Sequence, residues 1–394
     1  MKPKVLIVDT HPVQYRSPIY AAITEGDEVD LSVVYYNDAS VRGYHDVEFG
    51  KEVKWDSSLL AGHRHDIMIP DAQSTCAGFF GFAQIRPKDV LERYQPDIII
   101  IHSLNNLVGF KFAFFAKLKG IACWLRVETQ DEAFVRKSKA KSLARRFIYR
   151  AAYRFFDGAF CFGELNKKHL LTHGFKDKDI VYSRFSTVDR ARLLTPDVKE
   201  HRRSKVRSSL SISARDLVVG FFGKLIPKKD PSIVLEACRA LARSTDRNVV
   251  CLVVGSGELE SDLRDRFRDH DNVTYHFVGF VNQLQITDYY LATDILVLPS
   301  RREGEVWGLV CNEALQAGCA VVMSDAVGAA LEFGHLERCG IFPTGDLDRL
   351  VNILAHLSTF ERSFDWAAPY IADYSTEAAA TAITAVAARY GKRQ

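Results

Sequence analysis

Short apolar runs recur along the whole chain and alternate with stretches in which hydrophobic and polar residues follow a helical period. Runs rich in valine, isoleucine and leucine between polar flanks are typical of strands that are buried on both faces of a parallel sheet. In the first half we expect strands at Val5–Asp9, Leu31–Tyr36, Ile98–His102, Ala122–Val127 and Ala159–Phe162. In the second half we expect them at Leu217–Phe222, Val249–Val254, Val273–Val278, Ile295–Leu298, Ala320–Met323 and Gly340–Phe342.

The amphipathic stretches between these strands predict helices, for example over Pro231–Arg243 and Asp346–Leu357. Alternation of buried strands with helices predicts an α/β fold, with helices on both faces of parallel sheets and ligands at the carboxyl ends of the strands. The alternation weakens between Arg184 and Asp216, where a proline and a basic run interrupt it, so we interpret this stretch as an interdomain connection. The chain therefore divides into a first domain, a linker and a second doubly wound domain, at residues 1–185, 186–216 and 217–372.

Composition narrows the class of protein. The 394 residues include 52 Lys and Arg against 49 Asp and Glu, a net charge of +3, and 47% of them are hydrophobic and 26% charged. These proportions are those of a globular protein and exclude a disordered or fibrous one. The near-neutral balance argues against nucleic acid as a partner, because bulk binding to phosphates needs a strongly basic face.

The cysteines and the start of the chain indicate the compartment. Eight cysteines lie mostly in apolar runs without a Cys-x-x-Cys pair, which indicates small buried side chains in a reducing compartment. The apolar run near the start, Val5–Val8, is shorter than the core of a signal peptide, and no apolar stretch approaches the roughly 20 residues of a membrane span. We therefore expect a cytoplasmic protein.

Several common site motifs can be set aside. Val254-Gly255-Ser256-Gly257 follows a strand, but Glu260 stands where a dinucleotide fingerprint has its third glycine, and a tight strand-to-helix turn explains the segment as well. The sequence contains no Walker A, Gly-x-Ser-x-Gly or His-Glu-x-x-His motif. Asp-x-Asp pairs lie at turns and helix starts, and the cysteines lack metal-ligand spacing. We therefore assign no metal and no cofactor.

The stretch 298–318 carries the clearest chemistry. A strand ends at Leu298, a loop holds Glu305, and a helix follows it. Because the first N–H groups of a helix lack intrahelical partners and favour an anion, we expect a phosphate at the helix start. Glu313 lies one turn further on, where its carboxylate would accept ribose hydroxyls, and Glu305 would face the other end of the ligand. The backbone groups at the helix start are those of Gly308, Leu309 and Val310.

At this point the sequence resembles a known family. Glu305 and Glu313 form a Glu-x7-Glu pair. The blocks that accompany the pair are, in chain order, Gly223-Lys224-Leu225 with Lys229-Asp230, Val254–Gly257, Phe277–Phe280, Pro299-Ser300-Arg301, Gly308-Leu309-Val310 and Val321–Asp325. Together, across Val218–Asp348, these blocks resemble the family 4 retaining glycosyltransferases of the GT-B fold.

The resemblance implies a fold and a division of labour. It implies two doubly wound Rossmann-like domains that face a cleft, with the acceptor bound by the first domain and the nucleotide-sugar by the second. It also implies that residues 373–394 carry a helix, over Thr376–Arg389, that crosses back to the first domain.

The resemblance also implies residue roles. Lys224 and Lys229 would neutralise the donor pyrophosphate, although Lys224 stands where the family has arginine and Asp230 where it has glycine. Glu305 would hold the donor-sugar hydroxyls and Glu313 the ribose. The further donor-binding positions are Gly255, Trp307, Gly308, Leu309 and Val310. In this family the acceptor attacks on the face of the leaving group with a phosphate oxygen as base, so neither an enzymic nucleophile nor a divalent metal is expected.

The first half carries a different loop after its first strand. The segment His11–Pro18 stands where the family has a glycine-rich loop, and it resembles a subgroup of bacterial cell-surface polysaccharide transferases with His-Pro-x-Gln-Tyr. One interpretation makes it an acceptor or donor-sugar loop that binds through Gln14, Tyr15 and Arg16. The other makes it a proline-capped turn into a helix.

The catalytic histidine that many family members carry after their fourth strand is missing. Glu128 is nearest to its place, and His102, at the end of the preceding strand, is a neighbouring catalytic candidate. The other interpretation makes His102 a hydrogen-bonded strand-end residue. Arg126 and Glu128 are expected either to bind substrate or to form a structural ion pair.

Residues 137–156 are basic and aromatic with helical spacing. Such a helix either keeps a solvated face over the core or lies on anionic lipid, which would suit a lipid-linked acceptor.

We therefore expect a bacterial retaining glycosyltransferase, cytoplasmic or peripheral at the inner face of the cell membrane. It would move a sugar from a nucleotide-sugar to a glycan, lipid-linked or protein acceptor in cell-surface polysaccharide biosynthesis. Two alternatives remain, a GT-B enzyme such as a nucleotide-sugar epimerase and a non-catalytic relative that binds nucleotide-sugar within a synthesis complex. The donor base, the sugar and the acceptor stay open.

Overall fold

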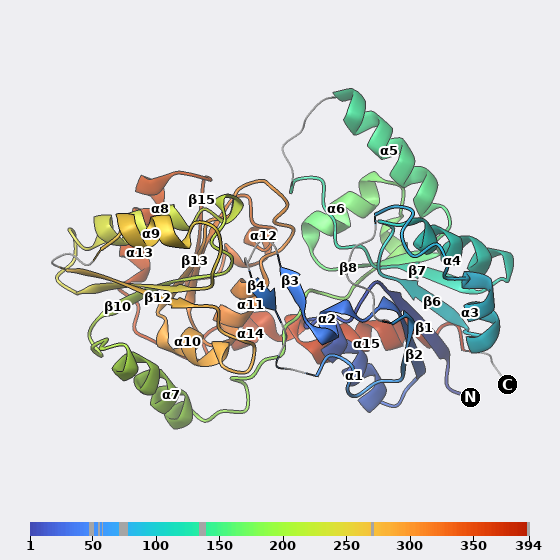
Figure 1. Cartoon of the computed structure of the whole chain (residues 1–394), viewed down its shortest axis with the longest axis horizontal. Coiled ribbons are helices and arrows are strands. Elements are labelled where there is room, and N and C mark those ends of the chain that lie inside the picture. Colours follow the sequence, from blue (N-terminus) through green and yellow to red (C-terminus); the bar gives the residue numbers. More distant parts are fainter. Residues whose placement is uncertain are drawn as a thin grey trace.

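The computed structural model describes residues 1–46, 51–53, 56, 58–70, 78–133, 139–268 and 272–391. Figure 1 shows two α/β domains side by side, each built around its own sheet, with both termini at the first domain. The two large sheets are parallel at each of their strand pairings. The expectation of two doubly wound parallel-sheet domains is confirmed.

The sheet of the first domain has seven strands in the order β5-β2-β1-β6-β7-β8-β9. Their bounds are β1 (Lys4–Asp9), β2 (Asp30–Asn37), β5 (His65–Ile69), β6 (Ile98–Ile101), β7 (Ala122–Leu125), β8 (Gly158–Cys161) and β9 (Ile180–Tyr182). The helices are α1 (Ser17–Glu25), α2 (Ala39–Arg42), α3 (Pro87–Tyr94), α4 (Leu107–Leu118), α5 (Lys139–Tyr153), α6 (Glu164–Thr172) and the short η1 (Asp177–Asp179). A separate antiparallel pair is formed by β3 (Tyr44–Asp46) and β4 (Lys51–Val53).

The sheet of the second domain has six strands in the order β12-β11-β10-β13-β14-β15. Their bounds are β10 (Leu217–Phe222), β11 (Val249–Val254), β12 (Val273–Gly279), β13 (Ile295–Leu298), β14 (Ala320–Ser324) and β15 (Cys339–Phe342). The helices are α7 (Pro196–Ser209), η2 (Pro227–Lys229), α8 (Pro231–Leu241), α9 (Glu260–Arg266), α10 (Ile286–Ala292), α11 (Leu309–Gln316), α12 (Ala330–Phe333), α13 (Leu347–Leu357), α14 (Ala368–Ile371), η3 (Ala372–Tyr374) and α15 (Thr376–Ala387).

The apolar runs form central strands because the two faces of each strand pack into different hydrophobic cores. In β1, Leu6 and Val8 face a core shared with α3 and α4, whereas Val5 and Ile7 face a core shared with α1 and α15. Helix α15 thus follows the second domain in sequence but buries Ile383 in the core of the first. Figure 1 shows this helix, in red, running beneath the first sheet.

The strand order fixes where a ligand can sit. In the first sheet the direction of winding reverses between β1 and β6, and in the second it reverses between β10 and β13. The loops that leave two such strands diverge, so a crevice opens at their carboxyl ends. The loops after β10 and β13 carry Lys224, Lys229 and Glu305, and the loops after β1 and β6 carry Arg16 and His102.

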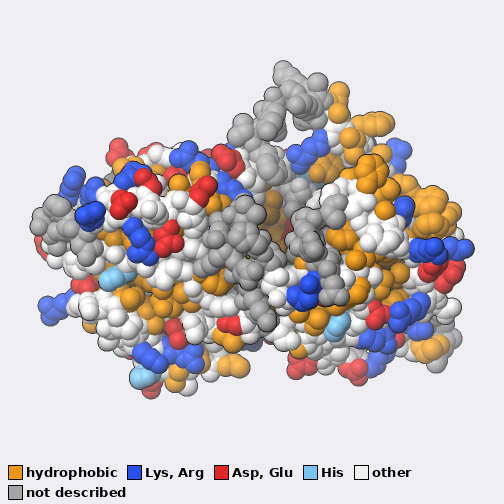
Figure 2. Space-filling model, in the orientation of Figure 1, with side chains coloured by type: hydrophobic (Ala, Val, Ile, Leu, Met, Phe, Trp, Pro, Cys, Tyr) orange, Lys and Arg blue, Asp and Glu red, His pale blue; other side chains and the backbone are white. Residues whose placement is uncertain are grey.

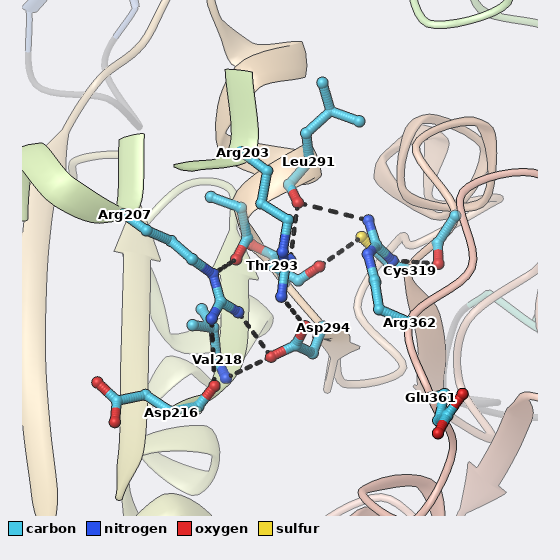
Figure 3. A network of polar contacts seen from close by, with 12 residues as sticks. Arg203, Arg207, Asp216, Val218, Leu291, Thr293, Asp294, Cys319, Glu361 and Arg362 are labelled. Atoms are coloured by element: carbon cyan, nitrogen blue, oxygen red, sulfur yellow. Dashed lines mark hydrogen bonds and ion pairs between the residues drawn. The ribbon is translucent and has the colours of Figure 1, made fainter. Parts of the chain in front are cut away.

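Helix α7 ties part of the stretch 186–216 to the second domain. Arg203 donates to Asp294 Oδ1 at 2.7 Å and to the Leu291 carbonyl at 2.9 Å, and Arg207 donates to Asp294 Oδ2 at 2.8 Å (Figure 3). Burial would raise the pKa of the Asp294 carboxyl, but the two arginines outweigh it and the pKa is lowered. The buried carboxylate therefore stays charged and anchors the helix beside β13.

The predicted strands agree with the observed ones to within two residues, whereas β5, β9 and the β3–β4 pair were not predicted. Strand β5 lies at a sheet edge with half-buried side chains, including His65 and Asp66, so its sequence lacks the apolar signature. Seven of the cysteines are free thiols and six of them are buried; Cys76 lies outside the described residues, as do residues 134–138 of the basic stretch. Within the described ranges, no helix combines the length and the apolar character needed to cross a bilayer.

Candidate active site

Two loops from neighbouring strands of the second sheet form the core of the site. The first follows β10 and the second follows β13. They are held together by the Arg301 amide, which donates to the Lys228 carbonyl at 2.8 Å, and by the Arg301 guanidinium, which contacts the Asp230 carboxylate at 2.9 and 3.0 Å. Asp230, which stands where the family has glycine, takes a left-handed conformation with φ of 48°. This geometry fixes the spacing of the charged side chains on the two loops.

Glu305, on the second loop, contacts Lys229, on the first. Its Oε2 accepts hydrogen bonds from the Lys229 ammonium and from the Ser300 hydroxyl, the latter at 2.8 Å. Burial acts to raise the pKa of Glu305, but Lys229 and Ser300 outweigh it, so the pKa is lowered. The structure therefore brings together the ammonium expected to neutralise the donor pyrophosphate and the carboxylate expected to hold the donor-sugar hydroxyls. Lys224 is half-buried on the same loop as Lys229.

Gly308 makes the turn from the second loop into α11. Its φ of 104° is in the left-handed region, and a Cβ there would lie 2.5 Å from the Leu298 side chain, so only glycine fits. The first two residues of α11, Leu309 and Val310, follow this turn directly. Orphan N–H groups at a helix start attract anions.

Two expected donor-binding residues lie beneath the site. Trp307 is only 2% exposed, packs against Phe162 and Phe185 of the first domain, and donates its indole N–H to Asn312 at 2.8 Å. It supports the start of α11 and, contrary to expectation, does not line the cavity. Gly255 has φ of 139°, and a Cβ there would lie 1.8 Å from the Gly223 carbonyl oxygen, so its backbone packs directly under the first loop.

A cavity of about 180 Å³ lies between the domains, and both domains line it. The expected residues Gln14, Tyr15, Leu309, Val310 and Glu313 are among its lining. Sequence reasoning missed Arg190 and Gln283, which also line it. Nothing in the sequence pattern singles them out, because Arg190 falls in the expected linker and Gln283 precedes a short helix.

Glu313 has an unusual charge state for a carboxyl group. Burial raises its pKa to about 7, although the Tyr290 hydroxyl, which donates to Oε2 at 2.7 Å, and Arg190 act to lower it. A carboxyl that is half protonated near neutral pH gains most from new hydrogen-bond donors, because each donor stabilises its charged form. Hydroxyl groups of a ligand in the cavity would be such donors.

A buried polar cluster lies at the carboxyl ends of β1, β6 and β7. Arg16 pairs with Asp9 at 3.1 Å and lies 3.9 Å from Glu128, whose Oε2 accepts a 2.7 Å hydrogen bond from Tyr15. Tyr20 donates to the other oxygen of Asp9 at 2.8 Å. The His11–Pro18 loop is thus held rigidly, with Tyr15 reaching both the cluster and the cavity.

His102 and Arg126 complete this cluster and are almost fully buried, at 3% and 2% exposed. His102 Nε2 lies 3.3 Å from the Tyr20 hydroxyl, and burial, together with Arg16 and Arg126, lowers its pKa well below the usual range. Arg126 donates to the Ser183 carbonyl at 3.2 Å. His102 is therefore a neutral side chain at the end of a strand. It belongs to this buried cluster and is not exposed to a ligand.

The loop after β7 connects the first domain to the Glu305 loop. Gly304 donates its amide to the Ala133 carbonyl at 2.9 Å, and the Gln130 amide donates to the Val306 carbonyl at 3.2 Å. Arg302 donates to the Glu132 carbonyl at 3.3 Å. The position of Glu305 therefore depends on both domains.

The fold defines the class. The two domains form a GT-B fold, and similar solved structures cover nearly the whole chain. The Anabaena protein HepE in complex with UDP and glucose has a TM-score of 0.59 at 16% identity, covering 98% of this chain and 95% of its own. UDP-GlcNAc 2-epimerase from Methanocaldococcus jannaschii has a TM-score of 0.59 at 14% identity, covering 99% of this chain and 100% of its own. Identities this low establish the fold alone.

The sequence family narrows this class. Residues 202–361 match the family described as glycosyl transferases group 1, so the match lies in the second domain and includes Lys224, Lys229, Glu305 and Glu313. The amylovoran biosynthesis glycosyltransferase AmsK of Erwinia amylovora is 32% identical over 165 residues, which are 40% of this chain and 39% of that protein. The chain matches about two fifths of the length of such curated relatives.

Proposed function

We propose that the protein is a retaining glycosyltransferase that moves a sugar from a nucleotide-sugar to an acceptor in cell-surface glycan biosynthesis. The observation that carries the proposal is the contact of Lys229 with Glu305 at the switch point of the second sheet, beside the start of α11. This arrangement offers positive groups for a diphosphate and a carboxylate for sugar hydroxyls in one crevice. It lies within the segment that matches the glycosyl transferase family.

Catalysis would rest on charge placed where the leaving group becomes negative. When the bond from the anomeric carbon to the diphosphate oxygen breaks, that oxygen gains negative charge, and preplaced cations lower the barrier. Lys224, Lys229 and the first N–H groups of α11 would supply this charge without a divalent metal. The acceptor oxygen then bonds to the anomeric carbon on the same face, and its proton passes to the departing phosphate oxygen. Configuration is retained and no enzymic nucleophile is needed.

The cavity residues would divide between donor and acceptor. Glu313 would accept the ribose hydroxyls, and Glu305 the hydroxyls of the donor sugar once the diphosphate has taken over Lys229. Gln14 and Tyr15 approach from the first domain and would contact the acceptor or the donor sugar. Arg16, Arg126, Glu128 and His102 would hold this loop in place from below. Because the neighbour HepE is seen with UDP and glucose, UDP-sugars are the first donors to test.

The surface of the first domain supports a lipid-linked acceptor. Leu143, Phe147 and Ile148 are 62% to 76% exposed and lie on one face of α5. Figure 2 shows orange and blue side chains together over α4 and α5. The exposed apolar side chains are Phe114, Leu118, Leu143, Phe147, Ile148 and Phe155, beside Arg146, Arg150 and Arg154. We infer that this surface rests on anionic lipid at the inner face of the cell membrane, with the protein itself in the cytoplasm.

The test has two stages. Thermal unfolding of the metal-free protein with UDP, GDP, ADP, CMP and their sugar conjugates should show stabilisation by one nucleoside diphosphate, with no further gain from Mg²⁺. Incubation with that nucleotide's sugars and short glycan or polyprenyl phosphate acceptors should then release the diphosphate and give a product with the anomeric configuration of the donor. Formation of an epimeric sugar without any acceptor would support the epimerase alternative. Tight binding with no turnover on any acceptor would support the non-catalytic one.

A further inference from the structure

A compact group of two histidines and one aspartate lies outside the crevice, where α6 meets the loop after β7. The Oδ2 atom of Asp131 lies 3.1 Å from His169 Nδ1 and 3.1 Å from His173 Nε2. The three ligand-type atoms are all within 4.8 Å of one another. Figure 1 shows α6 next to α5 on the first domain.

One of the two contacts, between His173 Nε2 and Asp131 Oδ2, is an ordinary hydrogen bond, whereas the contact of His169 with the same oxygen is not. Within the described part of the chain, His169 Nδ1 is buried and has no hydrogen-bond partner, although Asp131 Oδ2 is close enough, so the ring is not aligned for an N–H to oxygen bond. A tetrahedral ion with bonds of about 2.0 Å to nitrogen and oxygen keeps its ligand atoms about 3.3 Å apart. The two 3.1 Å separations are close to that value.

The histidines are presented rigidly. They are four residues apart on and just after α6, their side chains are 0% and 4% exposed, and their ring centroids are 4.3 Å apart. The Tyr153 hydroxyl lies 2.8 Å from His169 Nε2, the ring nitrogen that faces away from Asp131. A partner on the remote nitrogen of a metal-binding histidine fixes the ring and its tautomer.

We propose that Asp131, His169 and His173 bind a divalent cation of the zinc type, with solvent as the fourth ligand. Two nitrogens and one oxygen suit Zn²⁺, Co²⁺ or Ni²⁺ and disfavour Mg²⁺ and Ca²⁺, which prefer oxygen. Asp131 is 33% exposed, which leaves an entry path for the ion and a place for water. Arg145 contacts the other carboxylate oxygen, Oδ1, at 3.5 Å, so an ion at Oδ2 would replace only the hydrogen bond to His173.

The ion would brace the loop that reaches Glu305. Asn166 of α6 already holds this loop by donating to the Val127 and Thr129 carbonyls at 3.1 and 2.7 Å. Asp131 lies next to Gln130, which contacts the backbone of Glu305 and Val306. Lys168 also pairs with Glu132 and His173 with Asp131, so a bound ion would strengthen an existing attachment between α6 and this loop. It would act on the crevice through position alone.

The sequence alone does not reveal this group, because its members come from two separate segments and the four-residue spacing of the histidines is common in helices. The proposal does not depend on the glycosyltransferase assignment, since binding is measured without turnover.

The test uses the full chain, freed of metal by chelation and titrated with Co²⁺ under absorption spectroscopy, then with Zn²⁺ in competition. We expect one equivalent of Co²⁺ to give the intense visible bands of a four-coordinate site and Zn²⁺ to abolish them. Asp131→Asn and His173→Gln should each weaken binding by at least about tenfold. His201→Gln, which changes an exposed histidine on α7, should leave it unchanged.

A second readout separates loss of ligands from loss of fold. Hydrogen exchange of residues 127–133 should slow when Zn²⁺ is added to the wild type and should not change in Asp131→Asn, whose circular dichroism without metal should match the wild type. Binding below one half equivalent, or an affinity that survives Asp131→Asn and His173→Gln, would overturn the proposal. Metal-independent exchange of residues 127–133 would overturn the bracing role.

Discussion

The Tyr290 hydroxyl donates a 2.7 Å hydrogen bond to Glu313 Oε2, so the carboxylate that lines the interdomain cavity is supported from within the second domain. Burial is the largest influence on the pKa of this carboxyl and raises it, whereas Tyr290, Arg190 and Gln283 act to lower it. The carboxyl lines the cavity and can therefore accept further hydrogen bonds from a ligand.

The first prediction concerns the pH dependence of donor binding. Glu313 has a raised pKa of about 7, so it is mostly protonated below that pH and ionised above it. If ribose hydroxyls donate to the ionised form, the affinity for a nucleotide-sugar should increase from about pH 5.5 to about pH 8.5, with a midpoint near 7. Isothermal titration with the sugar conjugate, whose diphosphate does not titrate in this range, measures it. Glu313→Gln should bind more weakly and show a flat profile; a profile unchanged by this substitution would remove Glu313 from the ribose site.

The second prediction follows from the same pKa and concerns stability without ligand. The folded state binds the Glu313 proton more tightly than the unfolded state, so the free energy of unfolding should fall as pH rises from about 4.5 to about 7. Glu313→Gln removes the cost of the buried charge and should therefore stabilise the unliganded protein above pH 7 but not below pH 5. Urea unfolding at the two pH values checks the sign, and equal effects at both would contradict it.

The third prediction separates the catalytic from the structural part of the Lys229–Glu305 contact. Lys229→Ala leaves a largely buried carboxylate without its cation and should cost about 2–4 kcal/mol of unfolding free energy. Glu305→Gln should cost less, because a neutral amide needs no counter-charge. Each single variant should lower kcat by about 10²-fold or more.

The double variant Lys229→Ala with Glu305→Gln is the control for this contact. It should recover most of the lost stability and none of the lost turnover. Recovery of turnover in the double variant, or near-wild-type turnover in either single variant, would show that the assignment of these two residues is misplaced.

The fourth prediction concerns Gly255, which the sequence placed in the donor site and the structure places under the Gly223 loop. Gly255→Ala puts a Cβ 1.8 Å from the Gly223 carbonyl oxygen and should lower the unfolding free energy by about 3 kcal/mol or more. Gly345→Ala is the matched control, because it has φ of 84° with open space around it and should cost only about 1–2 kcal/mol. Denaturant unfolding compares them. Equal costs would mean that close packing is not what requires glycine at 255.

The sequence predicted those parts of the protein whose structure follows from the pattern of apolar and polar residues within one short segment. The strands β10 and β13 are buried along their whole length, so their apolar runs and the polar loops that follow located Lys224, Lys229 and Glu305. The sequence could not predict which side chains line the cavity or lie together where tertiary contacts decide their positions. Trp307 lies close in the sequence to Leu309 and Val310, which line the cavity. Its packing against Phe162 and Phe185, which the sequence does not reveal, places its side chain outside the cavity. Arg190, Gln283 and the Asp131–His169–His173 group are assembled from separate segments, which no spacing reveals.

The fifth prediction concerns the surface of the first domain that we propose rests on lipid. Phe147 and Ile148 are 76% and 62% exposed on α5, and arginines lie next to them, so apolar insertion and charge attraction would act together. Phe147→Glu with Ile148→Glu should abolish sedimentation with anionic liposomes while leaving thermal unfolding unchanged, because neither side chain is buried. Leu284→Glu, at a 54% exposed position in the second domain, is the matched control and should sediment like the wild type. Arg146→Glu with Arg150→Glu should bind weakly, and wild-type binding should fall with added salt as charges are screened. If the wild type does not sediment, or if the double Glu variant sediments as well as Leu284→Glu, α5 is not the lipid-binding element and a water-soluble acceptor becomes the better hypothesis.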